Sequence, residues 1–495
     1  MTAVGILGAG LSGVLAGISL LRAGVRDFVI YESQSDVGGT WLRNTYPGLH
    51  CDIPSHLFCY SFEPNPDFST VYAGQEEIQA YLRTCAEKYS VTEHIRFNTT
   101  AETAVLDEAK GTWTLELADG SVARHRVLIA ATGGLTAPHY PRIEGFDSFE
   151  GMVWHSGAWR HDVDLSDLKV AVIGSAASAI QVVPEVAKQA AKVVIFSRTP
   201  NWIIPRRNRS YSAADKAALR HPSNWRRTRR RQYRASMLWH HAFIKRGRAI
   251  ELLRGSVMEQ MRASIDDPAL IAALTPNYEL GCKRILVSDD YYPTLAKPHV
   301  ELVPHGVTAM TPTSLLAAND SEHRVDAAIF CTGYKLGGRE DGRPPLAVRG
   351  RGGLSLRRAY AEAPEAYRGV AVPRFPNYFT VCGVNGAAGH APVFLSAELG
   401  VDFIVRWVRK ILDRNLKLVE PNLAVTRRYN TAIQAELQSM SWGGECPGWY
   451  RDKQGRVVPF HPGSFGRMRR ELRDDHEADF DIELQRSAQG TTGTG

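Results

Sequence analysis

The chain contains two copies of one pattern, in which a short apolar run ends at a glycine and a helical apolar period follows. In the first copy, apolar residues lead into the turn "GAGLSG", and apolar positions then recur up to residue 21. The second copy runs from "KVAVIG" into "SAASAIQVV", and the next apolar runs are "DFVIYE" and "KVVIFSR" respectively. Short continuous apolar runs beside helical periods are typical of buried parallel strands covered by helices. The pattern therefore predicts an α/β fold with two Rossmann-like dinucleotide-binding domains.

The first glycine-rich turn has the spacing G-x-G-x-x-G at Gly8, Gly10 and Gly13, and the next apolar run ends at Glu32. In such a turn the first glycine permits the bend, the second lets the backbone approach a pyrophosphate, and the third lets helix and strand pack closely. The helix N-terminus then faces the phosphates, and the carboxylate of Glu32 can accept hydrogen bonds from ribose hydroxyls. This copy predicts a site for FAD or NAD.

The second turn begins at Gly174, but Ala176 and Ala179 occupy the other two glycine positions. Its following apolar run ends at Arg198, and 24 residues separate Gly174 from Arg198 as they separate Gly8 from Glu32. A guanidinium there suits a ribose that carries a 2′-phosphate, so this copy predicts an NADPH site. The methyl group of Ala176 lies where the backbone should meet the pyrophosphate, which would weaken or displace NADPH. The alternative is a degenerate nucleotide fold that binds no cofactor.

The first 21 residues carry no charged side chain, as in signal peptides and membrane-spanning helices. They lack the basic start of a signal peptide, however, and their glycines fall where a strand would turn into a helix. No later stretch offers about 18 uninterrupted apolar residues. We therefore expect a soluble protein without a transmembrane segment.

Composition narrows the class of protein. The 495 residues suggest about three domains, and the shares of 44% hydrophobic and 22% charged residues are ordinary for soluble globular proteins. The seven cysteines include no C-x-x-C pair and no run with metal-ligand spacing. This pattern favours reduced thiols in the cytoplasm and argues against a disulfide framework or a metal site.

The net charge of +7 has one main source. The segment "RRTRRRQYR" holds six arginines, at 226, 227, 229, 230, 231 and 234, in a region of helical patterning. We favour a solvated helix face, and attraction of anionic NADPH or of a membrane surface is the alternative. Nothing else in the sequence suggests nucleic-acid binding.

Two long motifs lie outside the apolar runs and turns described so far. The segment "FEGMVWHSGAW" fits F-x-G-x-x-x-H-x-x-x-W at Phe149, Gly151, His155 and Trp159, and "GGTWLRNTYPGLHCD" holds Gly38, Gly39, Trp41, Tyr46, Pro47, Gly48 and Asp52. Both resemble signatures of the Baeyer-Villiger-type, flavin-dependent monooxygenases (class B flavoprotein monooxygenases). The resemblance continues through "GCKR" at 281–284, "VDAAIFCTGY" at 325–334 and "NYFTVCGVNG" at 377–386, so it covers nearly the whole chain. One departure is Arg160, which stands where the family usually has proline, aspartate or glycine.

The resemblance implies that the second nucleotide-binding domain is inserted in the first. The FAD-binding domain would comprise residues 1–145 and 330–485, the latter with C-terminal helices. The NADPH-binding domain would comprise residues 146–329, with a helical insertion at about 205–275. The tail at 486–495 should be disordered.

The resemblance also implies roles for particular residues. Arg284 would be the fixed cation beside the anionic C4a-peroxide that reduced flavin forms with O2, and Asp52 would hold it. Lys283 would join Arg198 and Thr199 around the 2′-phosphate, whereas a solvated basic pair is the alternative for Lys283 and Arg284. The implied cofactor-binding residues are Gly8, Gly10, Gly13, Glu32, Gly39, Thr40, Trp41, Asp52, Tyr60, Gly174, Ser175, Ala176, Ser178, Arg198, Thr199, Lys283, Gly383 and Asn385.

Two aromatic residues receive alternative interpretations. The linker signature at 149–159 would lie where the chain passes between the two domains, so His155 would be a hinge and cofactor-contact residue. A buried structural histidine is the alternative. Trp442, in "MSWGG", matches a C-terminal tryptophan that reaches the nicotinamide and substrate region, although a place in the core fits a single aromatic residue equally well.

Together these features predict an enzyme that uses FAD, NADPH and O2 to convert small-molecule ketones to esters or lactones. The alternative within the class is an N- or S-oxygenating flavin monooxygenase, in which Arg284 matters less; Trp159 favours the former. A pyridine-nucleotide disulfide reductase is disfavoured by the missing C-x-x-C, and a non-catalytic nucleotide sensor by the presence of Asp52 and Arg284. The ketone is not specified, because variable loops build the substrate pocket, and a monomer and a homodimer both remain open.

Overall fold

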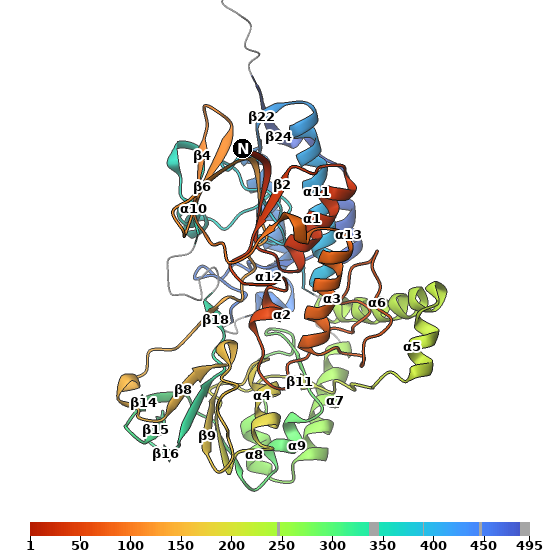
Figure 1. Ribbon diagram of the computed structural model, residues 1–495. Coiled ribbons are helices and arrows are strands. Elements are labelled where there is room, and N and C mark those ends of the chain that lie inside the picture. The colour runs from red at the N-terminus through yellow and green to blue at the C-terminus, as the bar shows by residue number, and fades with distance from the viewer. Residues whose placement is uncertain (245–247, 336–345, 390, 445–447, 486–495) are drawn as a thin grey trace, which may run out of the picture.

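The structure is a computed structural model that describes residues 1–244, 248–335, 346–389, 391–444 and 448–485. For the described residues within 238–249 it gives the backbone alone. Two sheets dominate the molecule, one in the upper part of Figure 1 and one in the lower part. The predicted disordered tail at 486–495 lies outside the described residues.

The first sheet has eight strands, in the order β19-β4-β5-β6-β1-β2-β3, with β20 also paired to β6. Its mutually parallel strands are β1 (Thr2–Leu7), β2 (Phe28–Tyr31), β3 (Ile95–Arg96), β6 (Val122–Ala130) and β20 (Tyr378–Thr380). Beyond β6 the sheet continues through β5 (Thr112–Leu117), which is antiparallel to β6, and β4 (Ala101–Asp107), which is antiparallel to β5. The edge strand β19 (Ala347–Arg349) is parallel to β4.

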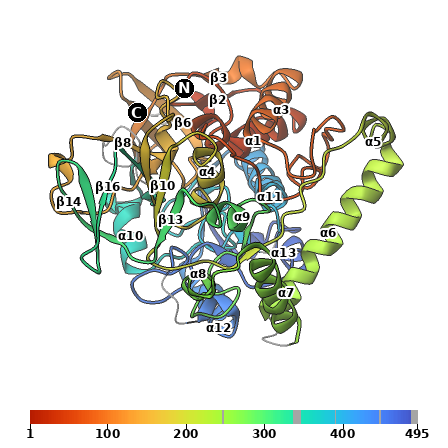
Figure 2. The ribbon, with the colours of Figure 1, turned by 90° about the horizontal axis from the view of Figure 1, so that it is seen from below.

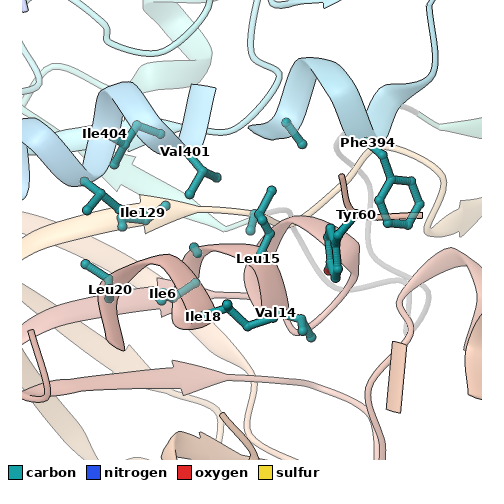
Figure 3. Close-up of a cluster of buried hydrophobic side chains, with 14 of the residues drawn as sticks. Ile6, Val14, Leu15, Ile18, Leu20, Tyr60, Ile129, Phe394, Val401 and Ile404 are labelled. Atoms are coloured by element: carbon teal, nitrogen blue, oxygen red, sulfur yellow. The ribbon is translucent and has the colours of Figure 1, made fainter. Parts of the chain in front are cut away.

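Both ends of the chain build the core beside this sheet. Helix α1 (Leu11–Arg22) packs against α3 (Gln75–Lys88) and against α11 (Val393–Asp413), which lies almost 400 residues further along the chain. Figure 3 shows Leu15 of α1 between Ile6 of β1 and Val401 of α11, all of them nearly or fully buried. The continuous apolar run of β1 is explained by this burial, since the strand lies inside the sheet and under helices.

The second sheet has five parallel strands in the order β13-β10-β9-β17-β8. They are β8 (Met152–His155), β9 (Lys169–Ile173), β10 (Lys192–Phe196), β13 (Val300–Val303) and β17 (Ala327–Phe330). Helices α4 (Ala179–Val186) and α9 (Tyr291–Leu295) share one core with it. A second core lies between the sheet and the small sheet of β14 (Val307–Met310), β15 (Ser314–Ala317) and β16 (Glu322–Arg324).

The chain crosses between the two sheets twice, and the crossings pair with each other. Strand β7 (Ala137–Pro138) follows β6 and is antiparallel to β18 (Tyr334–Lys335), which follows β17. The second sheet is therefore inserted between strands of the first. This confirms the predicted fold class, whereas the domain limits at 145 and 329 stay predictions.

The insertion within the second unit is helical, as predicted. It contains α5 (Ala213–Leu219), α6 (Pro222–Ile244), α7 (Arg248–Ser264) and α8 (Pro268–Leu274), framed by the short pair β11 (Ile203–Ile204) and β12 (Leu286–Val287). Figure 2 shows α5 and α6 along the outer edge of the molecule.

The remaining elements are short or C-terminal. They are α2 (Thr40–Arg43), η1 (Thr92–His94), η2 (Phe146–Ser148), η3 (Ser156–Ala158), η4 (Arg351–Gly353), α10 (Leu356–Glu362), β21 (Ala387–Ala388), β22 (Leu416–Pro421), α12 (Leu423–Gln438), η5 (Ser441–Gly443), β23 (Phe460–His461), α13 (Phe465–Glu471), η6 (Glu477–Asp479) and β24 (Phe480–Leu484).

One expectation from composition is wrong. Cys282 is disulfide-bonded, so the cysteines are not all reduced thiols. Five others are free, namely Cys51, Cys59, Cys85, Cys331 and Cys382, while Cys446 lies outside the described residues. Among the described residues, no cluster of histidine, cysteine and acidic side chains could hold a metal ion. No described helix is long and apolar enough to cross a membrane.

Candidate active site

The first glycine-rich turn uses its glycines for two different purposes. Gly8 has a φ of +98°, and a Cβ atom on Gly13 would lie 1.8 Å from the carbonyl oxygen of Gly8. Gly10 has an ordinary φ of −72°, and within 4 Å a Cβ there would meet only Gly39. Gly8 and Gly13 thus shape the strand-turn-helix unit, whereas Gly10 keeps a gap open in front of α1.

Gly39 lines the same gap from the other side. It has a φ of +57°, and a Cβ atom on it would lie 3.0 Å from the Cα of Gly10. Thr40, which follows, is exposed, while Trp41 is 9% exposed and packs edge-on against Phe58. Two stretches of backbone without side chains therefore face each other where the sequence predicts a pyrophosphate.

Glu32 lies beside this turn, at the end of β2. It is 5% exposed; its Oε2 accepts a hydrogen bond of 2.6 Å from the N–H of Ala9, and its Oε1 accepts one of 2.8 Å from the N–H of Gln34. No side chain caps the N-terminus of α1, so its first N–H groups are left for a ligand. A fixed carboxylate and uncapped N–H groups are what the ribose and pyrophosphate of FAD require, so the residues fit that cofactor.

Tyr60 supports the turn from inside. It is fully buried, and its hydroxyl donates a hydrogen bond of 2.7 Å to the carbonyl oxygen of Leu11 in the first turn of α1. Its predicted contact with a cofactor is not visible in this geometry, because the hydroxyl already has a partner in the protein.

The second glycine-rich turn keeps the one glycine that its fold needs. Gly174 has a φ of +126°, and a Cβ atom there would lie 2.4 Å from the carbonyl oxygen of Cys331. Ala176 is exposed, and Ser175 donates a hydrogen bond of 2.7 Å to the carbonyl oxygen of Thr199. Ser178 precedes α4 without capping it, but the N–H groups of Ile180, Gln181 and Val182 already bond to the carbonyl oxygens of Ala176 and Ser178. An N–H group for a phosphate must therefore come from the turn that precedes them.

The longer signature shapes the contact between the two nucleotide-binding units, which the sequence did not predict. The hydroxyl of Tyr46 donates a hydrogen bond of 3.3 Å to Gln181 of α4 and accepts one of 3.4 Å from Ser178. A Cβ atom on Gly48 would lie 2.7 Å from the carbonyl oxygen of Gln181. The residues around "YPG" therefore lie directly on α4.

Asp52 and Arg284 form an ion pair across 232 positions of sequence. The Nε of Arg284 donates to Oδ2 of Asp52 at 2.7 Å, and Nη2 lies 2.5 Å from the same oxygen. The side chains are 44% and 27% exposed, so the pair remains accessible. The charge of Asp52 raises the pKa of Arg284, which keeps the guanidinium protonated. The structure thus brings together the two residues predicted to be catalytic.

Tyr450 is a neighbour of this pair that the sequence analysis missed. It is 4% exposed and packs edge-on against Phe460, with 4.5 Å between ring centres. Burial raises the pKa of Tyr450 to about 12, while the charge of Arg284 and a hydrogen bond with the Arg284 backbone act in the opposite direction. The dipeptide Trp449-Tyr450, in a C-terminal segment otherwise rich in turns, was the available signal.

Arg198 and Lys283 of the second unit are near enough for the charge of one to affect the other. Arg198 is exposed, and the amino group of Lys283 lies 4.7 Å from the ring centre of Tyr278. Burial and, next, the charge of Arg198 lower the pKa of Lys283. Two cations that repel each other form a suitable site for a dianionic phosphate, so this pair fits the 2′-phosphate of NADPH.

The linker signature is a packing motif in this structure. A Cβ atom on Gly151 would lie 2.4 Å from the ring of Phe149 and 2.7 Å from the carbonyl oxygen of Asp326. The ring of Trp159 meets that of Trp154 edge-on, with 5.8 Å between centres. The spacing of phenylalanine, glycine and tryptophan is explained by these contacts.

His155 lies where the two crossings meet. It is fully buried between the rings of Tyr140 and Tyr334, at 5.6 and 5.4 Å, and its Nδ1 accepts a hydrogen bond of 3.0 Å from the N–H of Gly157. Burial lowers the pKa of His155 to about 4, so the ring is neutral at pH 7. The hydroxyl of Tyr334 in turn contacts Asn44 of the first unit. His155 is thus a buried histidine beside both crossings, and its roles as a hinge and as a cofactor contact stay predictions.

Two of the predicted cofactor-binding residues, Gly383 and Asn385, contact other parts of the protein. The Nδ2 of Asn385 donates to the carbonyl oxygens of Val457 and Phe460 at 2.8 and 2.7 Å, so this side chain holds the C-terminal segment. A Cβ atom on Gly383 would lie 2.3 Å from the hydroxyl of Thr380. Trp442 is 3% exposed and belongs to a hydrophobic cluster, as its core interpretation predicts.

The arginine segment divides into two faces on α6. Arg229 turns inward: its Nη1 donates to the carbonyl oxygen of His56 at 2.6 Å, and its guanidinium carbon lies 5.4 Å from the ring centre of Trp225. The other five arginines, at 226, 227, 230, 231 and 234, are exposed. Arg160, the departure from the linker signature, pairs at the surface with Asp162 at 2.5 Å.

Comparison with known proteins agrees with this geometry. The family model described as flavin-binding monooxygenase-like matches residues 1–337. The chain is 36% identical to a Baeyer-Villiger monooxygenase of Streptomyces coelicolor, over 97% of this chain and 92% of that relative. It is also 36% identical to a Baeyer-Villiger monooxygenase of Pseudomonas aeruginosa, over 94% and 88%. A solved steroid monooxygenase bound to NADP is 28% identical, with a TM-score of 0.87 over 98% of this chain and 100% of that chain.

Proposed function

This chain belongs to the flavin-binding monooxygenase-like family, and from that membership we propose that it is an FAD-containing monooxygenase of the Baeyer-Villiger type. It converts ketones to esters or lactones with NADPH and O2. The observation that carries the proposal is the ion pair between Asp52 and Arg284, which joins a loop of the first unit to a loop of the second. Its accessible guanidinium is the kind of group that ketone oxygenation needs.

Each of the two units binds one of the two cofactors. Bound FAD, reduced by NADPH, supplies the activated oxygen. The gap between Gly10 and Gly39, the N-terminus of α1 and the carboxylate of Glu32 hold the FAD. Arg198 and Lys283 would hold the 2′-phosphate of NADPH, while the turn from Gly174 to Ser178 would bind its pyrophosphate.

Arg284 acts through its charge and its shape. Asp52 takes the Nε and Nη2 side of the guanidinium, and among the described residues no hydrogen bond uses Nη1. Nη1 is therefore available to a ligand, and at reacting oxygen atoms its fixed positive charge would stabilise negative charge that develops during the attack on a ketone. Tyr450 lies close enough for its pKa to respond to the charge and the backbone of Arg284. No side chain has to remove a proton from the ketone in this scheme.

Replacing Arg284 tests the proposal. Arg284→Ala should retain FAD and still accept electrons from NADPH, but ester formation should fall by about 100- to 1000-fold, the usual cost of losing such a group. Oxygen uptake should then end as hydrogen peroxide. Arg284→Lys should also be poor, because an ammonium cannot bind Asp52 and a second partner with the same planar fork. Product analysis of a ketone panel by mass spectrometry measures the yield.

The exposed Arg428 of α12 offers a matched control, and Arg428→Ala should behave like the native enzyme. A normal ester yield from Arg284→Ala would remove Arg284 from the mechanism. Sulfoxide or N-oxide formation by the native enzyme, without ester, would instead support heteroatom oxygenation. Preference for NADPH over NADH is part of the proposal. Location in the cytoplasm stays a sequence prediction, and the disulfide at Cys282 weakens its argument from reduced thiols.

A further inference from the structure

Five arginines of α6 form one stripe on the outside of the molecule. Arg226, Arg227, Arg230, Arg231 and Arg234 are exposed, and at about 100° per residue they fall within about 140° of the helix circumference. The opposite side of the helix carries Trp225 and the inward-turned Arg229, which pack on the protein. The stripe therefore lies on the side of α6 away from these packed residues, and Figure 2 shows α6 itself at the outer edge of the molecule.

The charge of this α6 stripe is not balanced by its surroundings. The sequence of α6 contains no aspartate or glutamate. Among the described residues, none of the five arginines makes an ion pair, whereas the nearby Arg209 and Arg220 pair with Asp215 and Asp67. Arginines four positions apart, such as 226 and 230, repel each other and weaken an isolated helix. An external anionic partner would remove this cost.

An apolar groove lies at the start of the stripe. It has a volume of about 280 Å³ and shares Arg226 with the stripe. Its other lining residues are Pro64, Pro66, Leu219, Arg220, Pro222 and Trp225. The backbone of a nucleic acid would use the guanidinium groups but not an adjoining apolar groove. A phospholipid has a use for both, because its phosphate binds arginine and its acyl chain is apolar.

We propose that the α6 stripe docks this enzyme on a membrane surface that contains anionic phospholipids. The row from Arg226 to Arg234 spans about 12 Å of straight helix, which lets several guanidinium groups meet the plane of phosphates together. The groove beside Arg226 takes part of one lipid chain. The association is peripheral and electrostatic, so it is reversible and depends on ionic strength.

Vesicle sedimentation with the full-length, FAD-loaded protein tests the proposal. The native protein should sediment with vesicles of phosphatidylcholine and phosphatidylglycerol at low salt, but not with vesicles of phosphatidylcholine alone. Raising the salt to about 0.5 M should release it, because the screening length falls to roughly 4 Å and the attraction between guanidinium groups and phosphates is weakened. Replacing all five arginines by glutamine should lower the partition coefficient by a factor on the order of 100 or more.

A second five-residue variant controls for net charge. It replaces exposed arginines on other elements by glutamine, at 124, 142, 324, 357 and 428, and should bind vesicles nearly as well as the native protein. NADPH oxidation and FAD content show that each variant is folded. The proposal is overturned if the native protein ignores both kinds of vesicle, or if the two variants lose binding equally. Binding of an oligonucleotide duplex or an acidic polypeptide through the stripe, without vesicle binding, would overturn it in favour of another partner.

Discussion

In the first glycine-rich turn, Gly10 and Gly13 meet different physical requirements. Gly13 is required by the protein itself, because any side chain there would collide with the carbonyl oxygen of Gly8. Gly10 is not required by the backbone, since its φ is ordinary and a Cβ there has only Gly39 within 4 Å. Such a position separates binding from folding, which makes it a suitable site for a mutation.

Gly10→Val should give a folded protein that does not retain FAD. The side chain would fill the gap between Gly10 and Gly39, where the pyrophosphate must approach the backbone. Flavin absorbance per mole of purified protein measures retention, and circular dichroism measures folding. Gly255→Ala in α7, where nothing lies within 4 Å, is the matched control and should keep its flavin. Stoichiometric FAD in Gly10→Val would show that the first turn is not the flavin site.

On the alkaline side, NADPH binding should weaken at a lower pH than it would if Lys283 had the ordinary pKa of a lysine. Burial and Arg198 lower the pKa of Lys283 below 10.5, so the amino group loses its charge at a lower pH. Binding is strongest below this pKa, where Lys283 is charged, and is lost as the pH rises through it. Titrations of NADP+ affinity against pH should show this fall, and Lys283→Arg should flatten it because arginine stays charged.

Arg198→Ala gives a second measurement of the same pair. Losing one charge-assisted contact costs about 1.5–3 kcal/mol, or roughly 10- to 100-fold in affinity. The preference for NADPH over NADH should therefore narrow. The variant would also lack the charge that lowers the pKa of Lys283, so the loss of NADP+ affinity at alkaline pH should occur at a higher pH. Equal rates with both nucleotides in the native enzyme would refute the assignment.

At the scale of elements, the linker between the two units is closely packed against the crossing strands. Strand β8 ends at His155, η3 follows, and β18 returns beside them with Tyr334. A Cβ atom on Gly157 of η3 would lie 2.6 Å from the hydroxyl oxygen of Tyr334. The hydroxyl of Tyr334 also contacts Asn44 of the first unit, so this packing includes residues of both units.

Gly157→Ala should therefore impair catalysis without removing FAD. The methyl group would push η3 away from β18, and the relation between the two units would change while the flavin site stays intact. We expect flavin reduction by NADPH to slow by more than a factor of about 10, a size typical of small misplacements in active sites. Stopped-flow reduction measures it. Adding Tyr334→Phe removes the hydroxyl but leaves the ring carbon Cε1 at 2.9 Å from the position of the new methyl group, so it should restore only part of the rate. An unchanged rate in Gly157→Ala would contradict the prediction.

At the scale of the whole molecule, three buried histidines link folding to pH. His56, His125 and His155 are 0–1% exposed and lie in different parts of the structure. Burial lowers the pKa of each to about 4, compared with 6.5 for a free side chain. The folded protein therefore leaves them neutral at a pH at which the unfolded chain already protonates them.

Stability should consequently be complete above pH 6.5 and fall as the pH drops from 6.5 towards 4. Each site contributes up to about 3 kcal/mol to this loss, in proportion to its pKa difference. Thermal unfolding midpoints across this range measure the slope. His56→Asn should make the slope shallower by about one site, whereas His221→Asn, an exposed position, should leave it unchanged. A midpoint independent of pH over this range would contradict the linkage.

The sequence by itself determined the repeating unit of the fold and the residues of its turns. Strand, glycine-rich turn, helix and charged strand end are local features, written within about 25 residues, so Gly8, Glu32, Gly174 and Arg198 were readable from their spacing. The pairing of Asp52 with Arg284 came from motifs of a family rather than from local spacing. The structure placed them together as that resemblance implies.

Tertiary structure alone decided which of the motif residues face a ligand. Asn385 and Tyr60 use their polar atoms on the protein, and Tyr450 reaches Arg284 from 166 positions away, because contacts between distant segments depend on how whole elements pack. The same holds for the arginines of α6. Their charge is visible in the sequence, but their orientation is not. Because Trp225 and Arg229 pack against the protein, the other five arginines face outward as one stripe. A side chain's neighbours across the chain are set by the fold's long-range geometry, which local patterns do not encode.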